Sequence, residues 1–115
     1  QDDHGATLLA MRKLGGVPML LSHSPDPFPR VPPDVRLMVA GHTHCGQIKL
    51  PVFGAISYVS KYGERFGCGL ITEGSRRVVV TAGIGTSVLP LRLGPPSDIW
   101  VLTLKAGKTR RDIRA

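Results

Sequence analysis

Three histidines stand where two apolar runs of the sequence end. A single residue, Thr43, separates His42 from His44 in VAGHTHCGQI (residues 39–48). His23 ends the run VPMLLSH (residues 17–23). Imidazole nitrogens are frequent protein ligands of zinc, iron and similar ions. An H-x-H pair alone is a weak pattern, however, because two surface histidines at the end of a strand produce it as well. The three histidines are therefore candidate metal ligands. Their placement in the fold must distinguish a metal site from surface histidines.

The two apolar runs must position these histidines. Residues 17–21 and 37–40 are separated by a proline-rich connection, about as long as a parallel crossover requires. Ligands of an α/β sheet gather beyond the carboxyl ends of its parallel strands. If the runs are neighbouring parallel strands, His23, His42 and His44 emerge on one rim. In an extended chain, residues two apart face the same way at about 6.5–7 Å, which suits a shared metal or a metal pair.

The remaining patterns favour an α/β fold that is mostly strands after residue 46. Residues 5–14 carry apolar side chains at helical spacing and are followed by two glycines, which predicts a helix. Residues 70–72 and 78–81 flank a glycine-containing turn and predict an antiparallel hairpin. Residues 98–104 predict a last strand.

The composition is that of a folded domain with an excess of positive charge. The 115 residues are 42% hydrophobic with a net charge of +7, which favours an anionic partner such as a phosphate compound. We expect one domain over residues 1–104, followed by a basic tail, residues 105–115. The tail is either a solvated terminus or a peripheral membrane contact. A nucleic-acid partner is not expected, because binding motifs are absent and only 5% of the residues are aromatic.

The sequence also bears on location and redox state. No stretch reaches the roughly 18–20 apolar residues of a membrane span, and no signal-peptide pattern is present. Cys45 and Cys68 are not in C-x-x-C or zinc-finger spacing, so no disulfide framework is predicted. We therefore expect two reduced thiols, Cys45 being buried, in the bacterial cytoplasm or at the inner-membrane surface.

Several segments together resemble a known family. LLSHSPDPFP (residues 20–29) followed by VAGHTHCGQI resembles the calcineurin-like metallophosphoesterases. Within them the sequence is similar to a bacterial branch of membrane-associated phosphodiesterases related to UDP-2,3-diacylglucosamine-type hydrolases. GERFGCGLIT (63–72), TAGIGTSVLPLRLG (81–94) and PPSDIWVLTL (95–104) resemble that branch in order and spacing. The similarity covers most of residues 17–104, and Gly41-His42-Thr43-His44 is its most specific part.

The resemblance implies a fold, a reaction and a ligand set. The fold is the C-terminal half of a four-layer α/β/β/α sandwich. His23 and His42 would bind one divalent ion and His44 a second, the ions being manganese, iron or zinc. The reaction would be hydrolysis of a phosphoester or pyrophosphate by a hydroxide that the two metals activate. The branch further implies lipid-linked or nucleotide-diphosphate substrates.

The match to the family is partial. Its earlier motifs, D-x-H, G-D-x-x-D and G-N-H-[DE], which supply the remaining ligands and a catalytic histidine, are not found as a set in this sequence. We therefore expect the chain alone to be inactive, and assign it no catalytic residue. The alternative is a truncated, non-catalytic fragment or an assembly module whose uncovered half accepts a partner chain.

Arg92 is the candidate substrate contact. It lies in the loop LPLRLG, and its guanidinium matches the geometry of phosphate oxygens. A structural salt bridge or a solvated arginine explains the same residue without any ligand.

Overall fold

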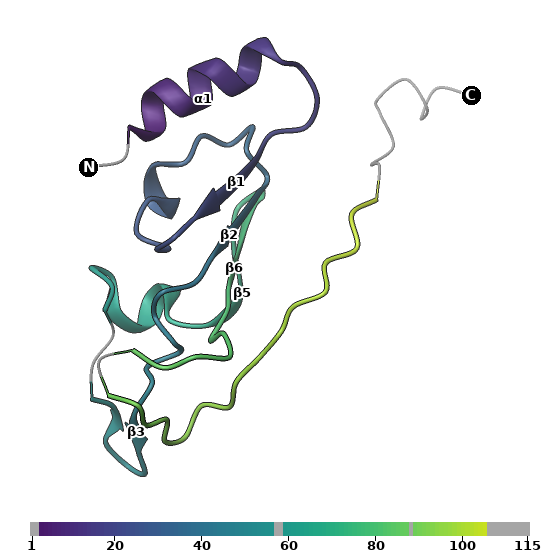
Figure 1. Ribbon diagram of the computed structural model, residues 1–115. Coiled ribbons are helices and arrows are strands. Elements are labelled where there is room, and N and C mark those ends of the chain that lie inside the picture. The colour runs from purple at the N-terminus through teal and green to yellow at the C-terminus, as the bar shows by residue number, and fades with distance from the viewer. Residues whose placement is uncertain (1–2, 57–58, 88, 106–115) are drawn as a thin grey trace.

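The computed structural model describes residues 3–56, 59–87 and 89–105, and these residues form a mixed α/β arrangement (Figure 1). The predicted α/β class is confirmed, while the four-layer sandwich stays a prediction. The elements in chain order are α1 (His4–Lys13), β1 (Met19–Ser22), the 3₁₀ helix η1 (Phe28–Arg30), β2 (Leu37–Ala40), β3 (Lys49–Leu50), β4 (Gly54–Ala55), the 3₁₀ helix η2 (Gly63–Phe66), β5 (Gly69–Glu73) and β6 (Arg76–Val80).

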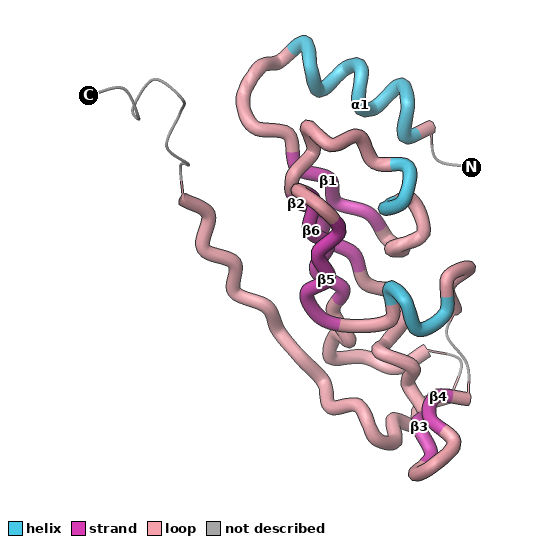
Figure 2. The backbone as a smooth tube through the Cα atoms, turned by 180° about the vertical axis from the view of Figure 1, so that it is seen from behind, coloured by secondary structure: helices cyan, strands magenta, loops and turns pink. Residues whose placement is uncertain are grey.

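Four strands form one sheet in the order β1-β2-β6-β5 (Figure 2). β1 and β2 are parallel, with Met19 opposite Leu37 and Ser22 opposite Ala40. β2 is also parallel to β6, and β5 and β6 form an antiparallel hairpin. The predicted parallel neighbours and the predicted hairpin are therefore confirmed. β2 lies inside the sheet, so the histidine turn that follows it starts from a well-supported strand.

The core lies where β2 and β6 are covered. Met38 of β2 is fully buried, and the consecutive valines 78–80 of β6 are buried as well, as is usual for a strand covered on both faces. Phe28 from η1 and Phe66 from η2 pack edge to face with ring centroids 5.5 Å apart. One 3₁₀ helix precedes the segment of His42 and His44 in the chain and the other follows it, and both contribute a phenylalanine to the same core.

The predicted helix is confirmed as α1. The Asp3 carboxylate accepts a hydrogen bond from the Ala6 N–H at 2.9 Å, which caps its N-terminus. Gly15 and Gly16 follow it with φ of 70° and 90°, a conformation that glycine adopts without penalty. Leu8 is the buried residue of α1 in the core, and the partly buried Met11 packs against the same core.

The predicted last strand is wrong for the residues that the structure describes. Residues 98–105 are not paired with a neighbouring strand and run outside the sheet (Figure 1). Ile99 is 82% exposed and Val101 89% exposed. A strand needs a backbone beside it to complete its hydrogen bonds, and an apolar pattern alone does not supply one. Of the predicted basic tail, all but Lys105 lies outside the described residues.

Candidate metal centre

His23 and His42 meet just beyond the carboxyl ends of β1 and β2. Their ring centroids are 4.3 Å apart, and the ring planes are inclined by 46°. The Gly41 N–H donates to the His23 carbonyl at 3.1 Å, which joins the two chain segments directly. The two parallel strands end in register, so the common rim follows from the pairing. The predicted meeting of these two histidines is confirmed.

The H-x-H segment is a turn, so the assumption of an extended chain is wrong. His42 has a φ of 70°, His44 of 49° and Cys45 of 57°. Residues with side chains seldom adopt this left-handed region, and each instance costs on the order of 1–3 kcal/mol unless the surroundings enforce it. Backbone strain of this kind is concentrated at functional sites. The two imidazoles are therefore placed by the turn and not by the two-residue period of a strand.

His44 carries a buried nitrogen with an unmet hydrogen-bonding capacity. Its Nδ1 atom is buried and has no hydrogen-bond partner among the described residues. An unpaired buried polar atom costs about 1–3 kcal/mol, and a bound cation would satisfy it. The rings of His23 and His42 are adjacent to each other, and all three imidazoles are donors of the kind that divalent ions bind. The residues present are thus compatible with the group that the resemblance implies.

Two carboxylates that adjoin the apolar runs in the sequence, Asp26 and Asp34, have other partners. Asp26 accepts hydrogen bonds from the Ser60 hydroxyl at 2.6 Å and from the Lys61 N–H at 3.1 Å. Asp34 pairs with the Arg12 guanidinium at 3.0 Å. In the described part of the chain, no three ligand atoms gather around His23 and His42 closely enough to enclose an ion.

The turn is held by a disulfide, so the prediction of two reduced thiols is wrong. Cys45 and Cys68 are bonded to each other, and neither cysteine is free. The partners are 23 residues apart, and only the fold brings the end of β2 next to the start of β5. Sequence spacing could not reveal that proximity. The burial of Cys45, which is 2% exposed, agrees with the prediction.

Arg92 is engaged by the backbone around the histidine turn. Its Nη2 atom donates to the Ala82 carbonyl at 3.0 Å, and its Nη1 atom to the His44 carbonyl at 3.4 Å. Further acceptors are the carbonyls of Gly83, Gly85 and Pro96. The guanidinium therefore links three loops. A phosphate contact by Arg92 stays a prediction.

Sequence reasoning missed two residues that organise the site. The Thr43 hydroxyl is buried and donates to the Gly67 carbonyl at 2.8 Å. The Gln47 side-chain amide donates to the carbonyls of Leu89 and Leu91 at 2.7 and 2.6 Å. The only signal in the sequence was their position, Thr43 between the two histidines and Gln47 three residues after His44.

An apolar pocket of about 250 Å³ borders His44. Its remaining walls come from the turn, from the segment around β3 and β4, and from the loop after β6. The lining residues besides His44 are Thr43, Gln47, Ile48, Ile56, Val59, Ser87 and Leu89.

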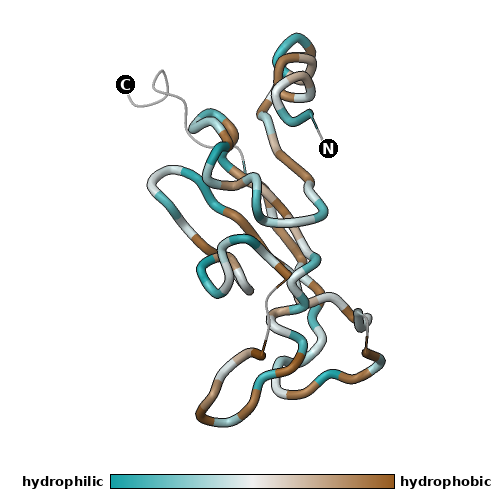
Figure 3. The backbone as a smooth tube through the Cα atoms, turned by 90° about the vertical axis from the view of Figure 1, so that its left-hand side faces the viewer, coloured by the Kyte–Doolittle hydropathy of each residue, from teal (hydrophilic) through white to brown (hydrophobic). Residues whose placement is uncertain are grey.

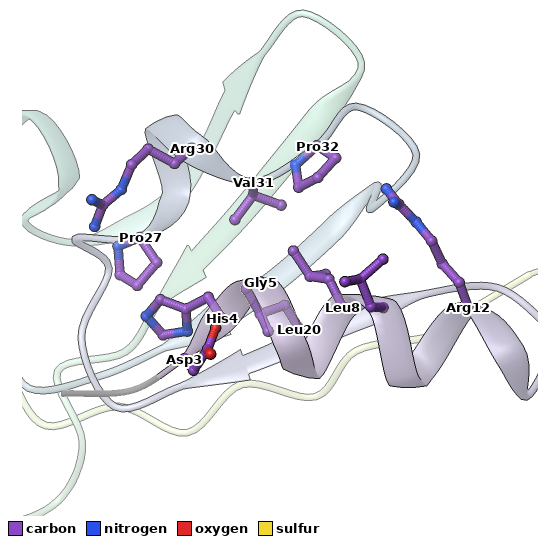
Figure 4. Close-up of a pocket in the computed structure, with 11 residues that line it drawn as sticks. Asp3, His4, Gly5, Leu8, Arg12, Leu20, Pro27, Arg30, Val31 and Pro32 are labelled. Carbon is purple, nitrogen blue, oxygen red and sulfur yellow. The ribbon is translucent and has the colours of Figure 1, made fainter.

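A larger cavity lies elsewhere, between α1, β1 and the segment that contains η1 (Figure 4). It encloses about 780 Å³, and His4, Arg12 and Arg30 are among its lining residues. None of the three candidate ligands lines it. We therefore associate the site with the smaller pocket, because His44 is one of its lining residues.

Comparisons with known proteins identify the family. The chain belongs to the calcineurin-like metallophosphoesterase superfamily. It is 39% identical over 89 residues to the uncharacterized metallophosphoesterase YkuE of Bacillus subtilis, an alignment that covers 76% of this chain and 31% of that protein. It is 32% identical over 87 residues to the phosphodiesterase YaeI of Escherichia coli, covering 75% and 32% of the two chains.

A vertebrate protein is also similar. The chain is 32% identical over 91 residues to a transmembrane protein with metallophosphoesterase domain from Danio rerio, covering 76% of this chain and 20% of that protein. No family model and no solved structure matches. The chain thus spans about a third or less of the length of these relatives. Among the described residues, no helix has the length and apolar character needed to cross a membrane.

Proposed function

We propose that this chain supplies three ligands of a two-metal centre that hydrolyses phosphoesters. The observation that carries the proposal is the placement of the histidines at the strand ends. His23 and His42 lie ring beside ring and hold one divalent ion, and His44 holds the second through its otherwise unpartnered Nδ1 atom. Manganese, iron and zinc all suit imidazole ligands.

The chemistry divides between the metals and the chain. When bound, two divalent ions activate water for attack at phosphorus and offset the charge that develops there. The chain fixes its imidazoles on a turn that is tied to two parallel strands. The positive charge of Arg92 lies close to the His44 carbonyl and adds to the attraction for an anion. The remaining metal ligands are expected from residues other than the three histidines. Asp26 and Asp34 are not assigned this role, because both already have other partners.

The surroundings of His44 support a substrate with an apolar group. The adjoining pocket is lined largely by aliphatic side chains, and such a lining holds an acyl chain better than a sugar or a base. Of the two substrate kinds that the resemblance implies, we therefore favour the lipid-linked phosphoester. A peripheral contact of the basic tail with an anionic membrane belongs to the same proposal.

The proposal is tested by measuring phosphodiester hydrolysis with the longest polypeptide that contains this chain. With Mn²⁺ and a nitrophenyl phosphodiester, His42→Ala is expected to abolish hydrolysis. His4→Ala, a change at the separate larger cavity, is the matched control and is expected to retain it. Undiminished hydrolysis by the His42→Ala protein would remove the role proposed for this residue. Residues 1–115 alone are expected to show no appreciable turnover.

A second candidate is a non-catalytic assembly module. β1 is an edge strand of the sheet, and Ile99 and Val101 are exposed on an unpaired segment. Unpaired edges and exposed apolar chains favour association with a further chain. Recovery of hydrolysis only after a separate N-terminal half is added would support this candidate for the chain on its own.

A further inference from the structure

The Cys45–Cys68 disulfide joins the histidine turn to the start of β5. We propose that this disulfide is a positioning element for His44, so that opening it weakens metal binding at His44. The inference rests on the proposed function, because it takes His44 as a metal ligand. Cys45 is the next residue after His44, so any change in its backbone is transmitted directly to the imidazole.

The backbone of the turn needs an external restraint. His44 and Cys45 have φ of 49° and 57°, a conformation that relaxes toward the ordinary regions when nothing enforces it. Two links oppose that relaxation from one side of the turn. They are the disulfide to Cys68 and the hydrogen bond from Thr43 to the Gly67 carbonyl. Both links end on adjacent residues and thus act as one attachment.

The two proposed metal positions depend on this attachment to different degrees. His23 is joined to Gly41 by a backbone hydrogen bond of 3.1 Å, and the strands before them are paired in register. His44 has no such strand support, and its carbonyl receives only a long contact of 3.4 Å from Arg92. Loss of the disulfide is therefore expected to affect the ion at His44 more than the ion shared by His23 and His42.

A small dithiol can open this bond from the solvent side. Cys68 is exposed, whereas Cys45 is buried. A thiolate of the reductant attacks the Cys68 sulfur, and the Cys45 sulfur leaves as a thiolate that takes up a proton. The second thiol of the reductant then closes its own disulfide and releases Cys68. Two electrons and two protons pass from the dithiol to the protein.

Manganese binding to the chain tests the inference without any measure of turnover. The serine double variant Cys45→Ser/Cys68→Ser is compared with the oxidised wild type by the paramagnetic resonance of free Mn²⁺. Mn²⁺ is the probe because it favours hard ligands over thiolates. Serine replaces both cysteines because reduced thiols, whose sulfur atoms lie within 4.8 Å of an Asp98 oxygen, could bind an ion themselves. The expected loss is about tenfold to a hundredfold in affinity at one site, the size usual for groups that orient a ligand.

Two comparisons separate the possible outcomes. Leu8→Ala destabilises the core far from the turn and is expected to leave Mn²⁺ affinity unchanged while the chain remains folded. In a His44→Ala background the serine changes are expected to have no further effect on binding. Equal affinity of the serine variant and the wild type, while His44→Ala still weakens binding, would overturn this inference alone. If His44→Ala has no effect on the oxidised chain, the proposed metal assignment itself is overturned.

Discussion

Arg92 is the residue whose substitution best separates a structural role from a role in substrate binding. Its guanidinium donates to carbonyls of three loops, and hydrogen bonds from a charged donor contribute about 1.5–3 kcal/mol. We expect Arg92→Ala to lower the free energy of unfolding by about 2 kcal/mol. Urea denaturation of the chain without any ligand measures this. An unchanged urea midpoint would leave the phosphate contact as the better account of Arg92.

Asp98 links acidity to the stability of the loops near the turn. Burial raises the pKa of Asp98, but hydrogen bonds from the Thr81 hydroxyl and the Trp100 indole lower it. The backbone N–H groups of Ala82 and Gly83 act in the same direction, and the net pKa lies below its ordinary value of 3.8. A carboxyl whose pKa is lowered by folding stabilises the fold above its ordinary pKa. That stabilisation is lost as the pH falls through the folded value.

The expected result is a stronger acid sensitivity in the wild type than in Asp98→Asn. Denaturant midpoints measured from pH 5 downward are expected to converge for the two proteins once the pH falls well below about 4. The comparison isolates Asp98 because Asp34, whose pKa is also lowered, is present in both proteins. Parallel curves over the whole range would contradict the prediction.

β2 is the element on which the histidine turn depends. Met38 is fully buried at its centre and lies opposite Val78 of β6. We expect Met38→Ala to lower the free energy of unfolding by about 2–5 kcal/mol, through lost burial and the cavity left behind. Leu21→Ala on β1 is the matched control, because Leu21 is 78% exposed. Thermal or urea denaturation of both variants gives the difference, and equal losses would argue against β2 as the supporting strand.

The sequence predicted elements where the pattern and the local chemistry agree. Two apolar runs ending in histidine became β1 and β2, and Gly74 between two apolar runs became the turn of the β5–β6 hairpin. The turn after β2 was not predictable, because left-handed φ at His42 and His44 contradicts the preference of residues with side chains. The disulfide was missed for a different reason: it depends on long-range proximity.

At the scale of the whole molecule, many large apolar side chains of the described residues are exposed. The segment 98–105 carries apolar residues without a neighbouring strand, and Figure 3 shows further apolar stretches in the loops at the end away from α1. We expect the isolated chain to self-associate as its concentration rises. Val101→Asp is expected to shift sedimentation toward the monomer. Thr103→Asp introduces the same charge at a nearby position that is already polar, and is expected to have a smaller effect. Identical sedimentation of both variants would contradict this.

The link between Cys45 and Cys68 also means that the finished molecule depends on a chemical event after synthesis. An oxidant must be present to join the two sulfurs, and a glutathione-rich cytosol works against it. Protein purified from such a cytosol would carry two thiols. Its histidine turn would then lack the covalent link to Cys68 during any metal titration. Refolding in a glutathione redox buffer, followed by counting of free thiols, should come before any comparison of preparations.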